Sequence, residues 1–282
     1  MNRPTRRTAS ARHRSSRVLG SSRVLGSALA AGLLLATAAC SSDDSGGTGA
    51  SASPSGKESP GASPSARTLS QSEAQAALIT NSDLGSQWTT SKGAAAWRDT
   101  LLKSKVDQQS FVTNKGNAAD CQKLLDGLYA ENLLGAPTGA HANTGFDDSD
   151  NDGQMRYQVA SYGQSEVDAN LKWLGTLPDK CDQFTAVDAK GGKQTVQVIE
   201  MSLPGVADAR QGLQITMNGS LEGEPTTLTL DYAAVRVGDS ALSLTNGGLQ
   251  GAESNSTTQA VQAGASRLSD VLAGKSPAPT QG

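Results

Sequence analysis

The sequence predicts an α+β fold, in which helices pack against one antiparallel β-sheet. A helical pattern begins the foldable part of the chain, and a longer one ends it. Between them several strand patterns follow each other directly, and consecutive strands pair most simply as antiparallel neighbours. The chain is 36% hydrophobic and 18% charged, as in globular proteins, and an aromatic content of 4% predicts a mostly aliphatic core.

The first predicted elements are two helices. Ser70 and Glu73 have the spacing of a capping box, which predicts a short helix ending at Ile79. The stretch Asp83-Leu84-Gly85 breaks it, and Trp88 then supplies a large core side chain. A second helix is predicted after Asn117, and its apolar face and its stop are Cys121, Leu124, Leu125 and Leu128, followed by Gly135-Ala136-Pro137.

Strands dominate the rest of the chain. Met155, Tyr157 and Val159 alternate with polar residues as a half-buried strand. A third helix is predicted from a cap at Ser165 to an end forced by Pro178. Further strands are predicted at 195–201, 213–217, 226–237 and 241–245, with Gly238-Asp239-Ser240 joining the last two. A final helix over 256–272 presents Val261, Ala265, Leu268 and Leu272 on one stripe.

Residues 1–39 have the pattern of a lipoprotein signal peptide. Seven arginines and a tandem hexapeptide (15–20 and 21–26) precede an uncharged apolar run. The run ends in Leu35-Ala36-Thr37-Ala38-Ala39-Cys40, which resembles a lipobox with Thr37 where Leu is usual. We therefore expect cleavage before Cys40 and a membrane lipid on its thiol. The alternative is an uncleaved membrane helix, for which the run is shorter than the ~20 residues a span prefers.

Composition predicts how the remaining chain is organised. Residues 40–68 are mostly Ser, Gly, Ala and Pro and bury too little apolar area to fold, so we expect a tether. A single domain is expected over 69–275 and a disordered tail over 276–282. Seven of the 24 basic residues precede Cys40, so the mature chain carries 17 basic and 27 acidic residues, a net charge of −10. That balance argues against a nucleic-acid partner.

Two cysteines remain after lipidation of the first. Export makes a disulfide between Cys121 and Cys181 the default, and two separate buried thiols are the alternative. The sequence has no Cys-x-x-Cys, which argues against a redox site.

The residue pattern resembles the extracellular sensor domain of PknH-type mycobacterial serine/threonine kinases and the actinobacterial lipoproteins similar to it. The matching pieces are Ala77-Leu78-Ile79, Asp83-Leu84-Gly85, Trp88, Cys121-Gln122-Lys123-Leu124-Leu125, Gln158-Val159-Ala160-Ser161-Tyr162, Cys181-Asp182-Gln183-Phe184 and Val235-Arg236-Val237-Gly238. The resemblance implies a monomeric α+β sensor-like domain with a cleft for an unidentified ligand. It transfers no binding residue. The kinases often have two disulfides, whereas one pair of cysteines is available here.

Few residues suggest chemistry, and each also has a simpler interpretation. The stretch 148–153 has the form D-x-D-x-D-G, half of a calcium loop, but Val159 stands where the bidentate Glu belongs, which favours an acidic turn. His141 lies in a Gly/Ala/Thr/Asn stretch typical of a solvated loop rather than of a general base. Trp97 and Trp173 are expected as core anchors more than as ligand platforms. We predict no metal, no cofactor and no catalytic site.

The sequence therefore predicts a lipid-anchored extracytoplasmic protein that is not an enzyme. Its sensor-like domain would bind an unknown small molecule. The alternative is a structural or protein-interaction lipoprotein of the cell envelope without a small-molecule site, whose partner is an envelope protein. An apolar concavity with converging polar groups would favour the first function, and a filled core with an exposed flat patch the second.

Overall fold

The computed structural model describes residues 68–91, 106–188 and 191–277. The chain divides into two units, 1–57 and 58–282, and all described residues belong to the second. Their nine strands form one sheet in the order β1-β3-β4-β9-β8-β7-β6-β5-β2, and every neighbouring pair is antiparallel. The strands are β1 (Trp88–Thr90), β2 (Val106–Phe111), β3 (His141–Asp148), β4 (Gln154–Ser161), β5 (Gln183–Asp188), β6 (Lys193–Glu200), β7 (Ala209–Leu221), β8 (Glu224–Val237) and β9 (Ser240–Gly248).

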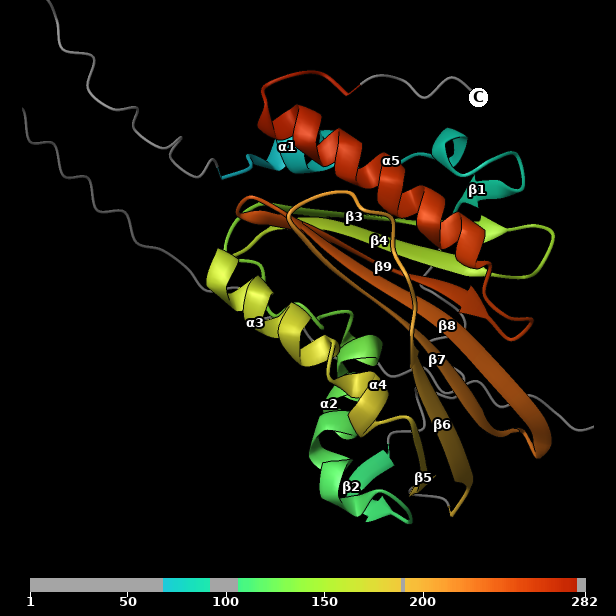
Figure 1. Cartoon of the computed structure of the whole chain (residues 1–282). Helices are drawn as coiled ribbons and strands as arrows, with labels where there is room; N and C mark the ends of the chain where they lie inside the picture. Colours follow the sequence, from blue (N-terminus) through green and yellow to red (C-terminus); the bar gives the residue numbers. More distant parts are fainter. Residues whose placement is uncertain (1–67, 92–105, 189–190, 278–282) are drawn as a thin grey trace, which may run out of the picture. The chain divides into compact units, whose positions relative to one another are not determined.

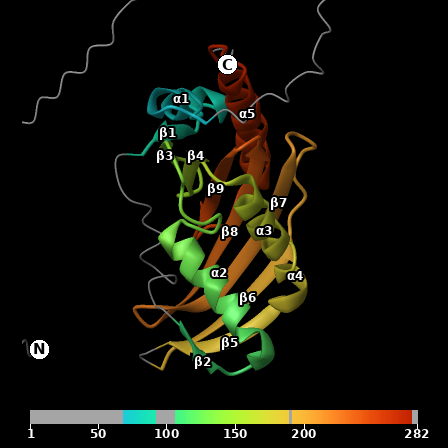
Figure 2. The same cartoon turned by 90° about the vertical axis from the view of Figure 1, so that its left-hand side faces the viewer.

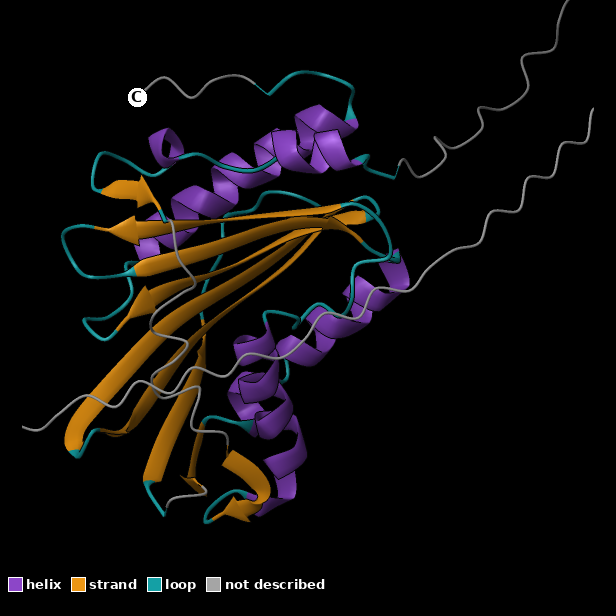
Figure 3. Cartoon of the chain, turned by 180° about the vertical axis from the view of Figure 1, so that it is seen from behind, coloured by secondary structure: helices purple, strands orange, loops and turns teal. Residues whose placement is uncertain are grey.

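Helices cover both faces of this sheet, which confirms the α+β prediction (Figure 1). On one face lie α1 (Gln71–Ala76), the 3-10 turn η1 (Asn81–Asp83) and the long α5 (Ser254–Leu272). On the other lie α2 (Ala118–Ala130), preceded by the 3-10 turn η3 (Lys115–Asn117), α3 (Gln164–Leu174) and α4 (Leu177–Lys180). Figure 2 shows α2, α3 and α4 in front of the strands, and Figure 3 shows the same layers from behind.

Side-chain alternation along the strands divides the core into two apolar layers, one on each face. Along β4, Met155, Tyr157 and Val159 point toward α1 and α5, as the predicted alternation requires. Along β8, Leu228, Leu230 and Tyr232 point toward α2 and α3. Because helices cover both faces, the central strands β8 and β9 are buried over most of their length.

Tight turns set the register of the central hairpins. Glu222 and Gly223 join β7 to β8, and both have positive φ, the backbone that a two-residue hairpin of the right twist needs. Gly238, also at positive φ, opens the turn between β8 and β9 that the sequence predicts. These turns hold Tyr232 opposite Thr245, which matters for the site below.

Most predicted helices form where expected. The capping box of Ser70 and Glu73 is present at α1, and α2 buries the four predicted apolar residues. Two details of the predictions are wrong. Gly163 and not Ser165 is the N-cap of α3, and Pro178 does not end that helix but lies in the first turn of α4, where its missing N–H costs no hydrogen bond.

Among the described residues, no helix is both long enough and apolar enough to span a bilayer.

Candidate functional site

The two cysteines of the domain are joined. Cys121 of α2 and Cys181, just after α4, form a disulfide with Cα atoms 5.7 Å apart, and both are fully buried. The bond ties α2 to the segment that follows α4. Both sulfurs lie inside the core, so this is a structural cross-link and not an accessible thiol site. Cys40, the predicted lipidation site, lies outside the described residues.

The half calcium loop at 148–153 forms the turn between β3 and β4. The carboxylate oxygens of Asp148 accept hydrogen bonds from within this turn. The carboxylate of Asp148 is 3% exposed and accepts hydrogen bonds from the Asp150 N–H at 2.9 Å and the Asn151 side-chain amide at 3.2 Å. Within the described ranges, no group of three or more His, Cys, Asp or Glu could hold a metal ion. The geometry is that of an acidic turn.

The remaining singled-out side chains have ordinary surroundings. The prediction that His141 lies in a loop is wrong, because His141 is the first residue of β3. Its side chain is exposed. Trp88 is buried, and its indole N–H donates to the Ser256 hydroxyl. Trp173 is only partly buried, and its indole N–H donates to Asp120. Trp97 lies outside the described residues.

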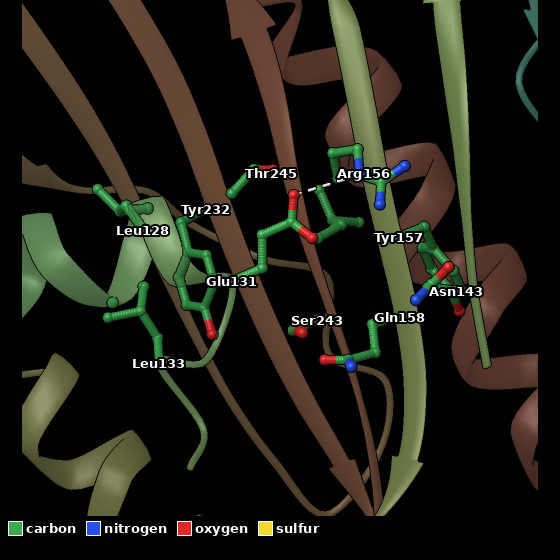
Figure 4. A pocket seen from close by; sticks show the side chains of 12 residues that line it. Leu128, Glu131, Leu133, Asn143, Arg156, Tyr157, Gln158, Tyr232, Ser243 and Thr245 are labelled. Atoms are coloured by element: carbon green, nitrogen blue, oxygen red, sulfur yellow. Dashed lines mark hydrogen bonds and ion pairs between the residues drawn. The ribbon is translucent and has the colours of Figure 1, made fainter. Parts of the chain in front are cut away.

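A small pocket lies between the end of α2 and the sheet (Figure 4). Its volume is about 30 Å³, roughly room for two water molecules. Apolar side chains of α2 and of the segment after it form one wall, and polar side chains of β3, β4, β9 and β8 form the other. The lining residues are Gly127, Leu128, Glu131, Leu133, Asn143, Arg156, Tyr157, Gln158, Tyr232, Ser243, Leu244 and Thr245.

Strand register gathers the polar wall from residues far apart in sequence. Arg156 of β4 lies directly opposite Thr245 of β9, which lies opposite Tyr232 of β8. In the next row, Gln158 lies opposite Ser243. Directly opposite residues of neighbouring strands point to the same face, so these rows form one polar surface under the end of α2.

An ion pair crosses the pocket from α2 to the sheet. The Nε–H of Arg156 donates to the Glu131 carboxylate at 3.2 Å, and the two side chains are 22% and 29% exposed. Glu131 is the C-cap of α2 and adopts the left-handed conformation at φ 55°, which is uncommon for a residue other than glycine. Glu131 therefore ends the helix, and its side chain extends over the strands, as Figure 4 shows.

Two hydroxyls on the pocket wall are buried without a hydrogen-bond partner in the described part of the chain. They belong to Tyr232, 4% exposed, and Thr245, 5% exposed. Burial raises the pKa of Tyr232 far above its usual 10, and Tyr162 adds a smaller effect of the same sign. The neighbouring Ser243 side chain lowers that pKa as a hydrogen-bonding neighbour, although the Tyr232 hydroxyl makes no bond of full hydrogen-bond geometry. The Tyr232 hydroxyl thus keeps its proton at physiological pH and acts as a donor. Figure 4 shows it directed toward Leu133 and Ser243.

A larger and more open groove lies on the outer side of the same wall, between α2 and α3. Its volume is about 620 Å³, and its lining mixes polar and apolar surface, with Lys123, Asp126 and Glu166 contributing charges. Gly127 and Leu133 border both the groove and the pocket. A Cβ on Gly127 would lie 2.4 Å from a methyl carbon of Leu133, so the leucine side chain packs directly against the glycine. These two residues lie between the pocket and the groove.

The sequence did not predict these site residues. Arg156, Tyr232, Ser243 and Thr245 each look like ordinary members of a strand, and only non-local pairing brings them together. The one available signal is the polar side chains on the second face of 154–161, where the alternating strand turns Arg156 and Gln158 away from the α5 layer.

Comparisons with known proteins add one structural likeness. No protein-family model and no curated protein matches this sequence. Among solved structures, the chain is similar to the extracellular domain of PknH from Mycobacterium tuberculosis at 13% identity and a TM-score of 0.42. The match covers 74% of this chain and 100% of that one. The site rests on its own geometry.

Proposed function

We propose that the domain is a binding module for a small ligand, carried outside the cell by a lipid on Cys40, and that it is not an enzyme. One observation carries the proposal: Tyr232 and Thr245, whose hydroxyls are buried without a hydrogen-bond partner, are among the residues that line a pocket. A buried polar group without a partner costs about 1–3 kcal/mol, so a ligand that supplies acceptors to both hydroxyls recovers that free energy on binding.

The pocket also has the mixed character that ligand sites share. Leu128 and Leu133 provide apolar surface from the helix side, and Arg156 and Gln158 provide orienting polar groups from the sheet. Because the cavity holds only about 30 Å³, the proposal is for a site that encloses one functional group of a ligand. The rest of the ligand lies toward solvent.

A second candidate function, a structural or protein-interaction role, is supported by the outer face of β5 to β8. Thr185, Thr195, Asn218 and Thr227 form a lateral row there. Their side chains bond one another, Thr185 to Thr195 at 3.2 Å and Thr227 to Asn218 at 2.8 Å. These four side chains are already hydrogen-bonded in pairs, whereas the hydroxyls of Tyr232 and Thr245 are not, so we rank the binding module first.

Native mass spectrometry tests the binding proposal. The purified protein is incubated with a small-molecule extract of the cell envelope and measured beside two variants. Thr245→Leu fills the pocket and removes one of its hydroxyls, and Thr216→Val, a half-buried threonine of β7, is the matched control. We expect a bound small mass on the wild type and on Thr216→Val that Thr245→Leu loses. Equal binding by all three proteins, or no bound mass on any, would contradict the proposal.

A further inference from the structure

We infer that the group this pocket takes is a carboxylate, which binds Arg156 in the position that the Glu131 carboxylate now occupies. The inference rests on the proposed function and adds the chemical class of the ligand. It follows from the donors that line the pocket, from its size, and from the side chain already present in it.

The polar wall is rich in donors that lack acceptors. A guanidinium is always charged and has five N–H donors and no acceptor. Arg156 uses its Nε–H toward Glu131, and neither of its Nη atoms has an acceptor within the described ranges. The hydroxyls of Tyr232 and Thr245 are buried and unpaired beside it. Such a set fits a ligand group that only accepts hydrogen bonds, which an ionised carboxylate does.

The shape of the site selects among acceptor groups. A carboxylate is planar and matches the fork of a guanidinium with two oxygens side by side. A volume of about 30 Å³ is enough for a group of that size and leaves the rest of the molecule outside. Small organic acids and the terminus of a short peptide share this chemistry.

Glu131 shows that the position suits a carboxylate. Its side chain comes from the C-cap of α2, contacts Arg156 and is 29% exposed, so a ligand that takes its place would have to displace it toward solvent. The glutamate therefore competes with the ligand for the same guanidinium. Removing Glu131 should strengthen binding, and removing Arg156 should abolish it. A purely structural ion pair would give neither effect on ligand affinity.

Nuclear magnetic resonance titration of the ¹⁵N-labelled full chain tests this at pH 7. The probes are sodium acetate, the neutral isostere acetamide, and sodium chloride at matched ionic strength. We expect acetate alone to give saturable shifts of the Thr245 and Tyr232 amides and of the Arg156 Nε–H. Glu131→Ala should tighten the acetate dissociation constant roughly fivefold, the factor expected for a weak, partly exposed ion pair. Arg156→Gln should remove the saturable shifts, and Glu224→Ala, an exposed charge control, should leave them unchanged.

The outcomes separate the two proposals. Acetate shifts that persist in Arg156→Gln, or that chloride reproduces, overturn the carboxylate assignment. Saturable binding of acetamide without acetate also overturns it but leaves a ligand pocket in place. If neither probe binds and native mass spectrometry finds no bound mass, the pocket holds only water and both proposals fail. Because Glu131→Ala predicts a gain, a folding defect cannot imitate the expected result.

Discussion

The buried polar side chains of this fold differ in whether they have hydrogen-bond partners. On the α5 side, the fully buried Asp231 accepts from Gln214 at 3.1 Å and from Thr257 at 3.0 Å, and Thr257 accepts from Asn246. A buried carboxylate is tolerated only with such bonds. Tyr157 is an exception on that side, because its hydroxyl is buried beneath Gly264 without a partner. Tyr232 and Thr245 differ from Tyr157 because their side chains lie on the other face of the sheet, under the end of α2, where the pocket is.

The Asp120 carboxylate gives a pH-dependent contribution to stability. Hydrogen bonds from Lys180 at 2.6 Å and Trp173 at 2.8 Å lower its pKa below the ordinary 3.8. A lowered folded-state pKa adds stability above the unfolded value and loses it as pH falls through the folded value. Asp120→Asn should therefore be less stable than wild type at pH 6, and this difference should narrow below about pH 4.

Urea unfolding of both proteins from pH 2.5 to 7 measures that difference. Asp126→Asn, an exposed acid on the same helix, is the control for a change in net charge. A difference between Asp120→Asn and wild type that stays constant over the whole range would contradict the expected linkage.

At the scale of single elements, α2 illustrates how packing can reverse a helix propensity. Replacing a helical glycine by alanine usually stabilises a helix by about 1 kcal/mol. At Gly127 the added Cβ would lie 2.4 Å from Leu133, so the leucine must move from its seat between pocket and groove. Overpacking costs typically ~1–3 kcal/mol, so we expect Gly127→Ala to destabilise the protein by about 1 kcal/mol.

A double-mutant cycle by urea unfolding checks the cause. Leu133→Ala alone should cost about 2–5 kcal/mol, since the side chain is 5% exposed. In that background Gly127→Ala should become neutral or stabilising, because the clash is gone. Additive effects of the two substitutions would show that Leu133 is not the obstacle.

The elements also show what the sequence can and cannot predict. Local periodicity was enough for α2, α5 and the central strands, because each has one apolar face or a long apolar run. It missed β1, β2, β3 and β5. β3 has a single β-branched residue, Thr144, and carries Asn143 and Gly145 on the face opposite Phe146, so its composition gives only a weak strand signal. The site could not be predicted for a different reason: Arg156 and Tyr232 come to the same surface only through the pairing of β4, β9 and β8.

For the folded domain as a whole, the disulfide is the strongest single constraint on the unfolded chain. Cys121 and Cys181 are 60 residues apart. A cross-link that closes a loop of that length lowers the entropy of the unfolded chain, and this stabilises the folded state by about 4 kcal/mol. The double variant Cys121→Ser/Cys181→Ser should therefore lose about 4 kcal/mol of unfolding free energy. Urea unfolding checks this, and alkylation of the denatured wild type should find neither cysteine free. Two alkylated thiols in that sample would contradict the cross-link.

The whole protein is also predicted to depend on Cys40 for its place in the cell. Its thiol is the group that carries the lipid, and more than one acyl chain is needed for stable anchoring. In cells, Cys40→Ser should move the protein from the membrane fraction to the medium or leave it as the unprocessed precursor. Detergent-phase partitioning and mass distinguish these outcomes from the wild type. Cys121→Ser, which removes a thiol in the folded domain, should keep both the partitioning and the mass shift of the lipid. Unchanged partitioning and size of Cys40→Ser would show that residues 1–39 hold the protein by another means.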